Sequence, residues 1–363
     1  SYINCQVLAD DLEERLRLPS RCIDLNYKLG GGLCYGTWTE LAGYESTGKS
    51  LLAMDFGYVA QQLGGVLIWA DAERAFDFKW GQKNGLDLSR IEIYRGEDIE
   101  GISDWSKAMM VHWRSKLTNN EPIVLVIDTI AALETKDNLA TDEKNTKAEM
   151  GNRAKAIYRY YRKRNRFLDD LGVVGIVINQ VRKKVGATMF EAAETMPGGD
   201  ATKFYASVRL MLHRSKQVKG FVNTKGKWTD SIDKGEKVGQ SIILEISKNK
   251  TAPPAGRFKT EVYFIEGKYD YVGYSKYAGL PDILLKLGTL KKQGSRWYYK
   301  DEMICNGEDN LVPLLHEKPK LRGRIIRSSG IATISKFRER LESITKNLYP
   351  LKGVKMTDDD EDE

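Results

Sequence analysis

The chain has 363 residues, of which 29% are charged, and its formal net charge at pH 7 is +7. This length suffices for one large hydrophobic core and a small additional domain. No stretch reaches the roughly 18–20 apolar residues of a membrane-spanning helix. The acidic opening SYINCQVLADDLEERL does not resemble a signal peptide, and the scattered cysteines predict neither zinc nor disulfides. A cytoplasmic location is therefore expected.

Residues 1 to about 18 are predicted to form a short amphipathic helix, with Val7, Leu8, Leu12 and Leu16 on one side, which Pro19 ends. This segment is too small for a domain. Residues 1–22 are therefore interpreted as an arm that packs on the core or contacts a neighbouring subunit.

The most informative stretch is GYESTGKS, residues 43–50, which matches the phosphate-loop pattern G-x-x-x-x-G-K-[ST]. A predicted strand over residues 36–42 precedes it and a predicted helix over 51–62 follows, which is the context that the motif requires. Lys49 supplies a cation for the β- and γ-phosphates, and the Ser50 hydroxyl suits Mg²⁺. The residues of this loop predicted to bind nucleotide are Gly43, Tyr44, Glu45, Ser46, Thr47, Gly48, Lys49, Ser50 and Leu51.

Three apolar runs at residues 66–70, 123–127 and 173–178 predict buried strands of a mostly parallel sheet. Asp71 and Glu73 follow the first run, Asp128 the second, and Gln180 the third. The carboxyl ends of parallel strands meet at one edge, where nucleotides bind in α/β folds. Asp128 is therefore predicted to share a Mg²⁺ site with Ser50.

Other segments have a weaker local signal. Residues 90–94, 207–212, 241–247 and 258–264 are predicted strands, residues 105–117 and 153–166 are predicted helices, and residues 216–239 are a predicted extended hairpin. The helix over 153–166 is rich in basic residues and tyrosines. A solvated or subunit-facing surface is favoured for it, and nucleic-acid contact is the alternative.

Two polar stretches, residues 139–151 and 181–200, are predicted loops. The second begins with basic residues, contains Phe190 and ends in Pro197, Gly198 and Gly199. Such a loop can follow a phosphate backbone and insert an apolar side chain between bases.

Beyond residue 279, predicted helices over 280–287, 311–315 and 331–348 and a hairpin over 294–300 indicate a small α+β domain. Residues 358–363 are all acidic, so the rest of the chain is more basic than the net charge suggests. A basic body with an acidic tail suggests a polyanionic partner, and a merely solubilising tail is the alternative. The expected organisation is an arm (1–22), a core (23–268), a carboxyl-terminal domain (269–348) and a flexible tail (349–363).

The chain resembles the RecA recombinases of bacteria and their phage relatives, including the UvsX type, over residues 19–315. The resemblance is carried by SRCIDLNYKLGGGLCYG, GYESTGKS, DAERAFD, VIDTIAAL, INQVRKKVG, GGDATKFYASVRL and SKNKTAPP, in family order and near family spacing. It implies a RecA-like α/β P-loop core and a DNA-dependent ATPase that exchanges DNA strands. The resemblance further implies helical filaments on single-stranded DNA, with ATP and Mg²⁺ at subunit interfaces and double-stranded DNA as a second partner.

The resemblance also implies roles for individual residues. Glu73 matches the carboxylate that activates the attacking water, and Gln180 matches the γ-phosphate sensor. Trp80 falls at the position of the aromatic that lies against adenine. The residues expected to act in catalysis are Lys49, Glu73, Gln180, Lys248 and Lys250, the last two by reaching the nucleotide of the adjacent subunit. The residues expected to bind DNA are Met150, Gly151, Asn152 and Arg153 at the first loop and Arg182, Lys183, Lys184, Val185, Gly186, Met189, Phe190, Gly198 and Gly199 at the second.

The chain departs from the family pattern in its short amino-terminal arm, a second loop that is one residue longer before Phe190, and the long 216–239 excursion. These departures favour a phage-encoded member. A ring-shaped helicase with the same core is one alternative function, against which the KNK block, the carboxyl-terminal domain and the acidic tail argue. A recombination mediator without ATPase activity is the other. The presence of Lys49, Glu73 and Asp128 argues against that reading. Single-strand-binding and mediator proteins are the further partners expected.

Overall fold

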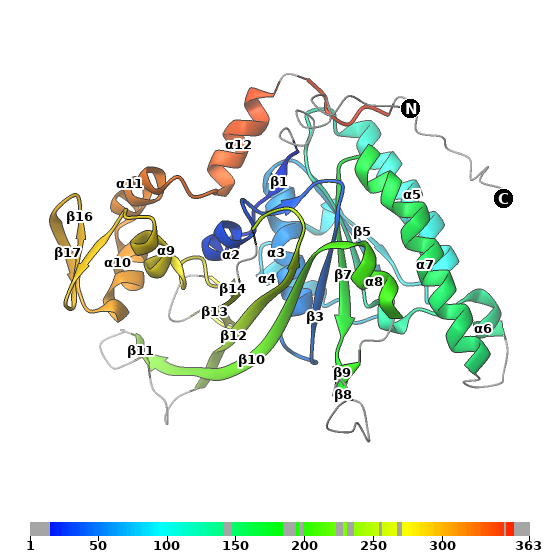
Figure 1. Ribbon diagram of the computed structural model, residues 1–363, viewed down its shortest axis with the longest axis horizontal. Coiled ribbons are helices and arrows are strands. Elements are labelled where there is room, and N and C mark those ends of the chain that lie inside the picture. Colours follow the sequence, from blue (N-terminus) through cyan, green and yellow to red (C-terminus); the bar gives the residue numbers. More distant parts are fainter. Residues whose placement is uncertain are drawn as a thin grey trace.

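The computed structural model describes residues 15–140, 147–183, 194–195, 199–222, 228–230, 236–253, 256–266, 271–344 and 346–351. A ten-stranded sheet with the order β14-β13-β12-β10-β3-β7-β6-β4-β5 forms the core, and β11 also pairs with β10 (Figure 1). Its strands are β3 (Trp38–Gly43), β4 (Val66–Asp71), β5 (Ile91–Tyr94), β6 (Ile123–Asp128), β7 (Val173–Gln180), β10 (Ala206–Val222), β11 (Trp228–Asp230), β12 (Glu236–Asn249), β13 (Gly256–Tyr263) and β14 (Gly273–Tyr274). Neighbouring strands pair in parallel from β10 through β3, β7, β6 and β4 to β5. On the other side of β10, the pairs β10–β12, β12–β13 and β13–β14 are antiparallel. The predicted mostly parallel α/β core is confirmed.

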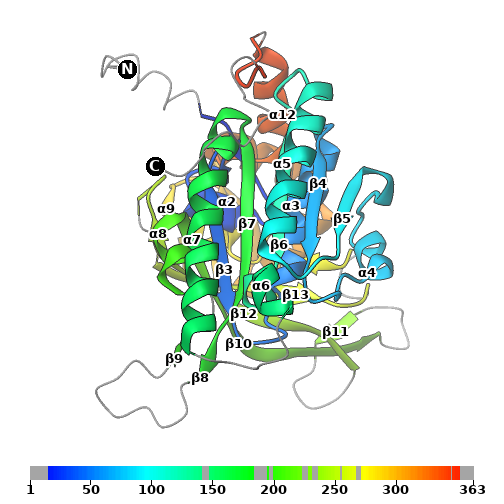
Figure 2. The same cartoon turned by 90° about the vertical axis from the view of Figure 1, so that its right-hand side faces the viewer.

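Helices cover both faces of the parallel strands. Helix α3 (Lys49–Gln62) packs on one face, and α5 (Ile99–Lys116) and α7 (Lys147–Asp170) run side by side on the other (Figure 2). Alternate strand residues divide between the two cores: Val124 and Val126 lie on the α3 side, whereas Leu125 and Ile127 lie on the α5 side. Shorter helices of the core are α2 (Ile23–Lys28), α4 (Phe78–Lys83), α6 (Lys136–Ala140) and α8 (Gly199–Tyr205). In the described part of the chain, no helix is long and apolar enough to cross a membrane.

The parallel arrangement brings the functional candidates to one edge of the sheet. Gly43 at the end of β3 is the register partner of Gln180 at the end of β7. Asp71 at the end of β4 is likewise the register partner of Asp128 at the end of β6. Residues that are far apart in the sequence are therefore brought together at the crevice along this edge of the sheet.

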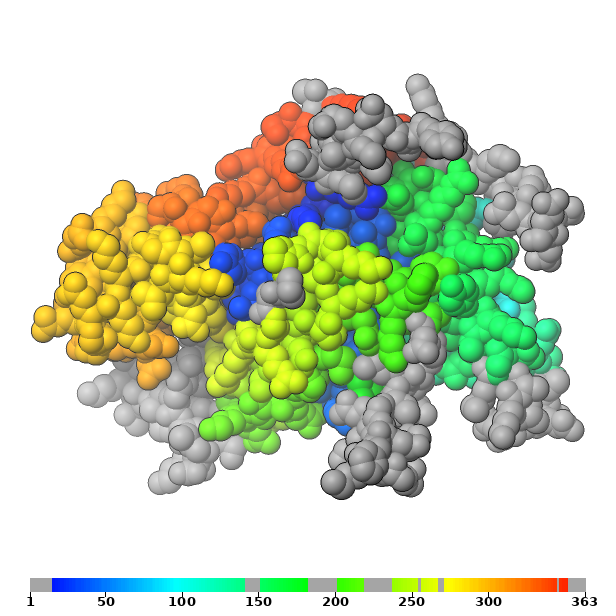
Figure 3. Space-filling model, viewed as in Figure 1, coloured from blue at the N-terminus to red at the C-terminus, as the bar shows by residue number. Residues whose placement is uncertain are grey.

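A carboxyl-terminal lobe projects from the β13 side of the core (Figure 3). It comprises α9 (Leu280–Lys286), β15 (Lys291–Gln293), β16 (Arg296–Tyr299), β17 (Glu302–Asn306), α10 (Leu311–Glu317) and α11 (Pro319–Ser329). Leu284, Trp297 and Ile325 belong to its separate hydrophobic cluster. Helix α12 (Ile334–Ser343) then returns to the main core, where Phe337 and Leu341 are buried beside α3.

The structure corrects the end of the predicted amino-terminal helix. Arg17 and Leu18 form β1 (Arg17–Leu18), which pairs with β2 (Leu33–Cys34). Leu16 and Leu18 are fully buried while Arg15 and Arg17 are partly exposed, so the burial follows the two-residue period of a strand. Residues 1–14 of the predicted helix lie outside the described residues.

Three other boundaries also differ from the prediction. The polar stretch 139–151 is not entirely loop, because α7 begins at Lys147. Within 181–200, β8 (Arg182–Lys183) pairs with β9 (Glu194–Thr195), and α8 begins at Gly199. The last predicted helix ends at Ser343 instead of residue 348, because Ile344, Leu348 and Tyr349 turn onto the core. The predicted hairpin over 216–239 is confirmed by the pairing of β10 with β12 out to Gly220 and Glu236.

Candidate nucleotide-binding and catalytic site

The phosphate loop connects β3 to α3 and is shaped by glycine. Gly48 has φ +91°, and a Cβ atom there would lie 2.9 Å from the Tyr274 hydroxyl oxygen, so only glycine fits. The Lys49 Nζ donates hydrogen bonds to the carbonyl oxygens of Gly43 at 3.0 Å and Tyr44 at 2.7 Å. Burial lowers the pKa of Lys49, and the carboxylates of Asp128, Glu73 and Glu45 oppose this shift. The loop therefore holds a cation at the place where the motif predicts one.

Ser50 and Asp128 form the predicted metal pair. The Ser50 hydroxyl donates a hydrogen bond of 2.8 Å to Asp128 Oδ2. Burial raises the pKa of Asp128 to about 6, and the carboxylates of Glu73 and Asp71 also raise it. The Ser50 hydrogen bond and Lys49 oppose this shift only in part, and oxygen ligands are those that Mg²⁺ prefers. The two side chains therefore fit a magnesium ion.

Glu73 lies in the turn after β4, and Gln180 ends β7. The Gln180 Nε2 donates a hydrogen bond of 2.8 Å to Glu73 Oε1. Buried Asp71 fixes this turn, because its carboxylate accepts hydrogen bonds from the backbone N–H of Ala75 at 2.8 Å and Phe76 at 3.2 Å. The predicted base and the predicted sensor are thus in direct contact.

Two residues of the site were not predicted from the sequence. Arg214 on β10 donates to the carbonyl oxygens of Glu45 at 3.1 Å and Ser46 at 3.2 Å, and Tyr274 on β14 donates to that of Gly48 at 3.1 Å. Neither belongs to a recognisable motif. A cleft of about 750 Å³ lies here, lined by Tyr44, Glu45, Ser46, Thr47, Gln180, Val181, His213 and Arg214.

Trp80 lies on α4, shortly after Glu73 in the chain. Its ring is partly buried against the α3-side core, and the Lys83 Nζ lies 5.7 Å from the ring centroid. The expected contact with adenine stays a prediction.

Lys248 and Lys250 do not join the phosphate loop of their own chain. Lys248 is the register partner of Arg209 on β10, three residues before Leu212, which pairs with Gly43. The Lys248 Nζ donates instead to the carbonyl oxygens of Lys203 at 2.6 Å and Phe204 at 3.2 Å, at the end of α8. Burial lowers the pKa of Lys248, and neighbouring Lys250 lowers it further. The Lys250 backbone N–H donates to the Ser207 carbonyl oxygen at 2.9 Å, so both lysines lie beside the start of β10 and apart from the crevice that holds Lys49.

Comparison with known proteins places this geometry in a family. A model of the RecA N-terminal domain matches residues 8–269 of the chain. The chain belongs to the RecA family. It is 31% identical over 308 residues to Protein RecA of Aquifex aeolicus, covering 84% of this chain and 80% of the relative. It is also 33% identical over 321 residues to Protein RecA of Chloroherpeton thalassium, covering 88% and 82% of the two chains.

A third relative, Protein RecA of Bartonella henselae, is 32% identical over 309 residues, which cover 85% of this chain and 81% of the relative. Membership of the RecA family confirms the predicted fold and the predicted activity of a DNA-dependent ATPase in recombination and strand exchange. ATP binding and DNA binding follow from the same membership.

In this RecA-family chain, the first group of predicted DNA contacts lies on α7 instead of in a loop. Met150, Gly151, Asn152 and Arg153 all belong to its first two turns. Arg153 forms an ion pair with Glu134 at 3.2 Å and donates to the Ile130 carbonyl oxygen at 3.4 Å, so internal contacts engage its guanidinium.

Of the second group, Arg182 and Lys183 form β8 and Gly199 begins α8. Six residues lie outside the described part of the chain: Lys184, Val185, Gly186, Met189, Phe190 and Gly198. The structure leaves these predictions untested.

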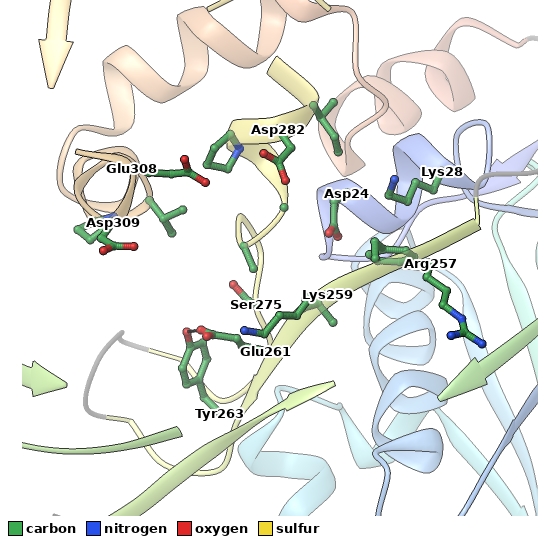
Figure 4. Close-up of a pocket in the computed structure, with 18 residues that line it drawn as sticks. Asp24, Lys28, Arg257, Lys259, Glu261, Tyr263, Ser275, Asp282, Glu308 and Asp309 are labelled. Carbon is green, nitrogen blue, oxygen red and sulfur yellow. Dashed lines mark hydrogen bonds between the residues drawn. The ribbon is translucent and has the colours of Figure 1, made fainter. Parts of the chain in front are cut away.

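A second cleft, of about 680 Å³, separates the lobe from β13 and contains none of the predicted site residues. Carboxylates of Asp282 and Asp309 line it on the lobe side, and Lys28 and Lys259 line it on the core side (Figure 4). Asp24, on α2, lies between these walls. Its carboxylate is almost fully buried, and the Cys22 thiol donates a hydrogen bond of 2.8 Å to its Oδ1.

Proposed function

We propose that this chain hydrolyses Mg²⁺-bound ATP at composite sites between adjacent subunits of a helical filament on single-stranded DNA. The observation that carries the proposal is the division of the predicted catalytic residues into two groups. Lys49, Glu73 and Gln180 converge on the crevice at the carboxyl ends of the parallel strands. Lys248 and Lys250 lie apart from that crevice, which agrees with the role that the resemblance implies for them at the nucleotide of the adjacent subunit.

Within the crevice, each side chain has a role that follows from its position. Lys49 and the loop N–H groups bind the phosphates, and Ser50 and Asp128 would hold Mg²⁺, which when bound neutralises phosphate charge. Glu73 is exposed beside the crevice and accepts the proton of the attacking water. Gln180 holds the Glu73 carboxylate in place and senses the γ-phosphate, because its amide can bind either partner.

The exposed face of α7 extends the proposed DNA-binding surface. Lys155, Arg159 and Arg162 repeat at helical spacing on this face, with Tyr158 between them, and all four side chains are exposed. Among the described residues, no carboxylate forms an ion pair with these three cations. Cations bind phosphates irrespective of sequence, and an exposed tyrosine offers a surface on which a base can stack. The basic residues Arg182, Lys183 and Lys184 are further DNA contacts in this proposal.

Several further parts of the proposal go beyond membership of the RecA family. The long hairpin, whose β10–β12 pairing reaches Gly220, supports a phage-encoded member acting in the cytoplasm of its host. Residues 1–22 would contact a neighbouring subunit, and single-strand-binding and mediator proteins are the partners expected. Residues 269–348 would act as a separate domain, although α12 packs on the core.

The direct experiment measures ATP hydrolysis by the purified chain with and without single-stranded DNA, alongside electron microscopy of the same mixtures. The proposal predicts stimulation by DNA and helical filaments that require a nucleotide. Closed rings on DNA would favour the helicase alternative, and filaments without hydrolysis would favour the mediator.

A further inference from the structure

Glu40 is a fully buried carboxylate on β3, three residues before the phosphate loop. Its Oε1 accepts a hydrogen bond of 2.9 Å from the Asn179 Nδ2, and its Oε2 accepts one from the Arg209 Nε. Asn179 lies on β7 and Arg209 lies on β10, the two strands that flank β3. One carboxylate therefore ties together three adjacent strands of the sheet.

Both partners of Glu40 are next to predicted catalytic residues. Asn179 is fully buried and immediately precedes Gln180. Arg209 is the register partner of Lys248, at a register shift between β10 and β12. The Ser247 hydroxyl donates a hydrogen bond of 3.3 Å to the Arg209 carbonyl oxygen and fixes the chain at this irregularity. Glu40 thus connects the strand end that carries the sensor with the strand end that carries the lysines.

The charges around Glu40 also require an explanation. Burying a carboxylate is costly unless it is paired and hydrogen-bonded, and a buried ion pair often gives less stability than apolar residues of the same volume. Three cations gather on its β10 and β12 side, namely Arg209, Lys248 and Lys250, and Glu40 is the acid that attracts Lys248. Apolar side chains at the positions of Glu40 and Arg209 would stabilise the sheet without the cost of burying charge. The buried ion pair therefore indicates that Glu40 positions the strands around it.

We propose that Glu40 is a positioning residue that holds the end of β7 and the end of β12 of each subunit in fixed positions relative to each other. Through Asn179 it sets the end of β7 and therefore Gln180. Through Arg209 it sets the end of β12 and therefore Lys248, which serves the next subunit. The inference rests on the proposed composite site, and it assigns to Glu40 no contact with nucleotide.

Glu40→Gln tests this proposal in the full chain, because it keeps the size of the side chain and removes its charge. Glu245→Gln is the matched control, since Glu245 is partly exposed on β12, where its carboxylate pairs with Arg257 at 2.7 Å and lies 3.3 Å from the His213 Nε2. We expect Glu40→Gln to bind a fluorescent ATP analogue without DNA within about twofold of the wild type. We expect its DNA-stimulated kcat to fall at least about tenfold while KM changes less than about threefold. An unchanged kcat would overturn the proposal.

A second variant keeps the proposal testable if Glu40→Gln unfolds. Glu40→Gln/Arg209→Gln removes both charges of the buried pair and therefore does not leave Arg209 without its carboxylate. A thermal midpoint near that of the wild type together with a low DNA-stimulated kcat would support positioning. Recovery of both quantities would show that Glu40 only neutralises Arg209, which would overturn the proposal. A wild-type chain without DNA-stimulated hydrolysis would instead count against the proposed function itself.

Discussion

Gln180 donates its side-chain amide to the carboxylate of Glu73 over 2.8 Å, although 107 positions separate the two residues in the chain. The contact joins the end of β7 to the turn after β4, across the crevice that the phosphate loop borders. An amide that binds the predicted base can also bind a phosphate oxygen. Loss of the γ-phosphate would therefore change the hydrogen bonding of Gln180 and with it the position of the Glu73 carboxylate, which is predicted to activate water.

Gln180→Ala should remove most of the stimulation of ATP hydrolysis by DNA. Because Glu73 loses the donor that orients it, we expect DNA-stimulated hydrolysis to fall by about a hundredfold, the scale of one lost oriented donor. ATP binding, measured with a fluorescent analogue, should stay within about threefold because Lys49 is untouched. Gln217→Ala, on the exposed part of β10, is the control. Full DNA stimulation in Gln180→Ala would contradict the sensor role.

Glu73→Gln should bind ATP and fail to hydrolyse it. The amide keeps the shape of the side chain and loses the ability to accept a proton, a change that typically costs about 10²- to 10⁴-fold in rate. Filaments on single-stranded DNA should consequently outlast those of the wild type when dissociation is followed after dilution. Glu97→Gln, which changes an exposed partner of Arg74 nearby, is the control. Normal turnover by Glu73→Gln would show that another group is the base.

Removing the three cations on the exposed face of α7 should weaken DNA binding through phosphate contacts. For Lys155→Ala/Arg159→Ala/Arg162→Ala, we expect the slope of log affinity against log salt to decrease by up to about 2 on single-stranded DNA. Fluorescence anisotropy over a salt series measures this slope, and hydrolysis without DNA should not change. Lys116→Ala, on the exposed surface of α5, is the control. An unaltered slope would place α7 outside the DNA-binding surface.

Asp24 predicts a pH-dependent contribution to folding. Burial raises the pKa of Asp24 to about 6, above its ordinary value of 3.8, although hydrogen bonds and Lys28 oppose the shift. A raised pKa means that the folded state loses stability as pH rises from about 4 to about 6, since the buried carboxyl must then ionise. Asp24→Asn should therefore be more stable than the wild type at pH 8, by an amount on the order of 2–3 kcal/mol, and about equally stable at pH 4.

Urea denaturation at pH 4 and pH 8, followed by circular dichroism, measures this difference. Asp282→Asn is the control, because Asp282 lies on the opposite, exposed wall of the same cleft. A stabilisation by Asp24→Asn that is equal at the two pH values would show that the charge of Asp24 is not its cause.

The parts of the fold that the sequence predicts are those with a local signal. The apolar runs of β4, β6 and β7 and the glycine pattern before Lys49 are contained in single short segments. The polar residues at the ends of these strands could also be placed together, because parallel strands present their carboxyl ends at one edge. The pairing of Ser50 with Asp128 follows from that rule.

The parts that could not be predicted depend on pairing between distant strands. Arg214 and Tyr274 contact the phosphate loop because β10 and β14 lie near β3 and α3 in space, and neither residue belongs to a motif. Glu40 resembles any charged residue in an apolar strand until the register places Arg209 opposite it. The start of α7 was missed because its first residues are polar, and polarity alone does not distinguish an exposed helix from a loop.

Mixing two inactive variants tests the shared catalytic site most directly. Lys49→Ala removes the phosphate-loop cation, and Lys248→Ala/Lys250→Ala removes the lysines that the adjacent subunit supplies. Each protein alone should be almost inactive on single-stranded DNA. Mixed in one filament, they should recover part of the ATPase activity, because some interfaces combine an intact phosphate loop with intact lysines. No recovery despite demonstrated co-assembly, or normal activity of the double variant alone, would contradict the shared site.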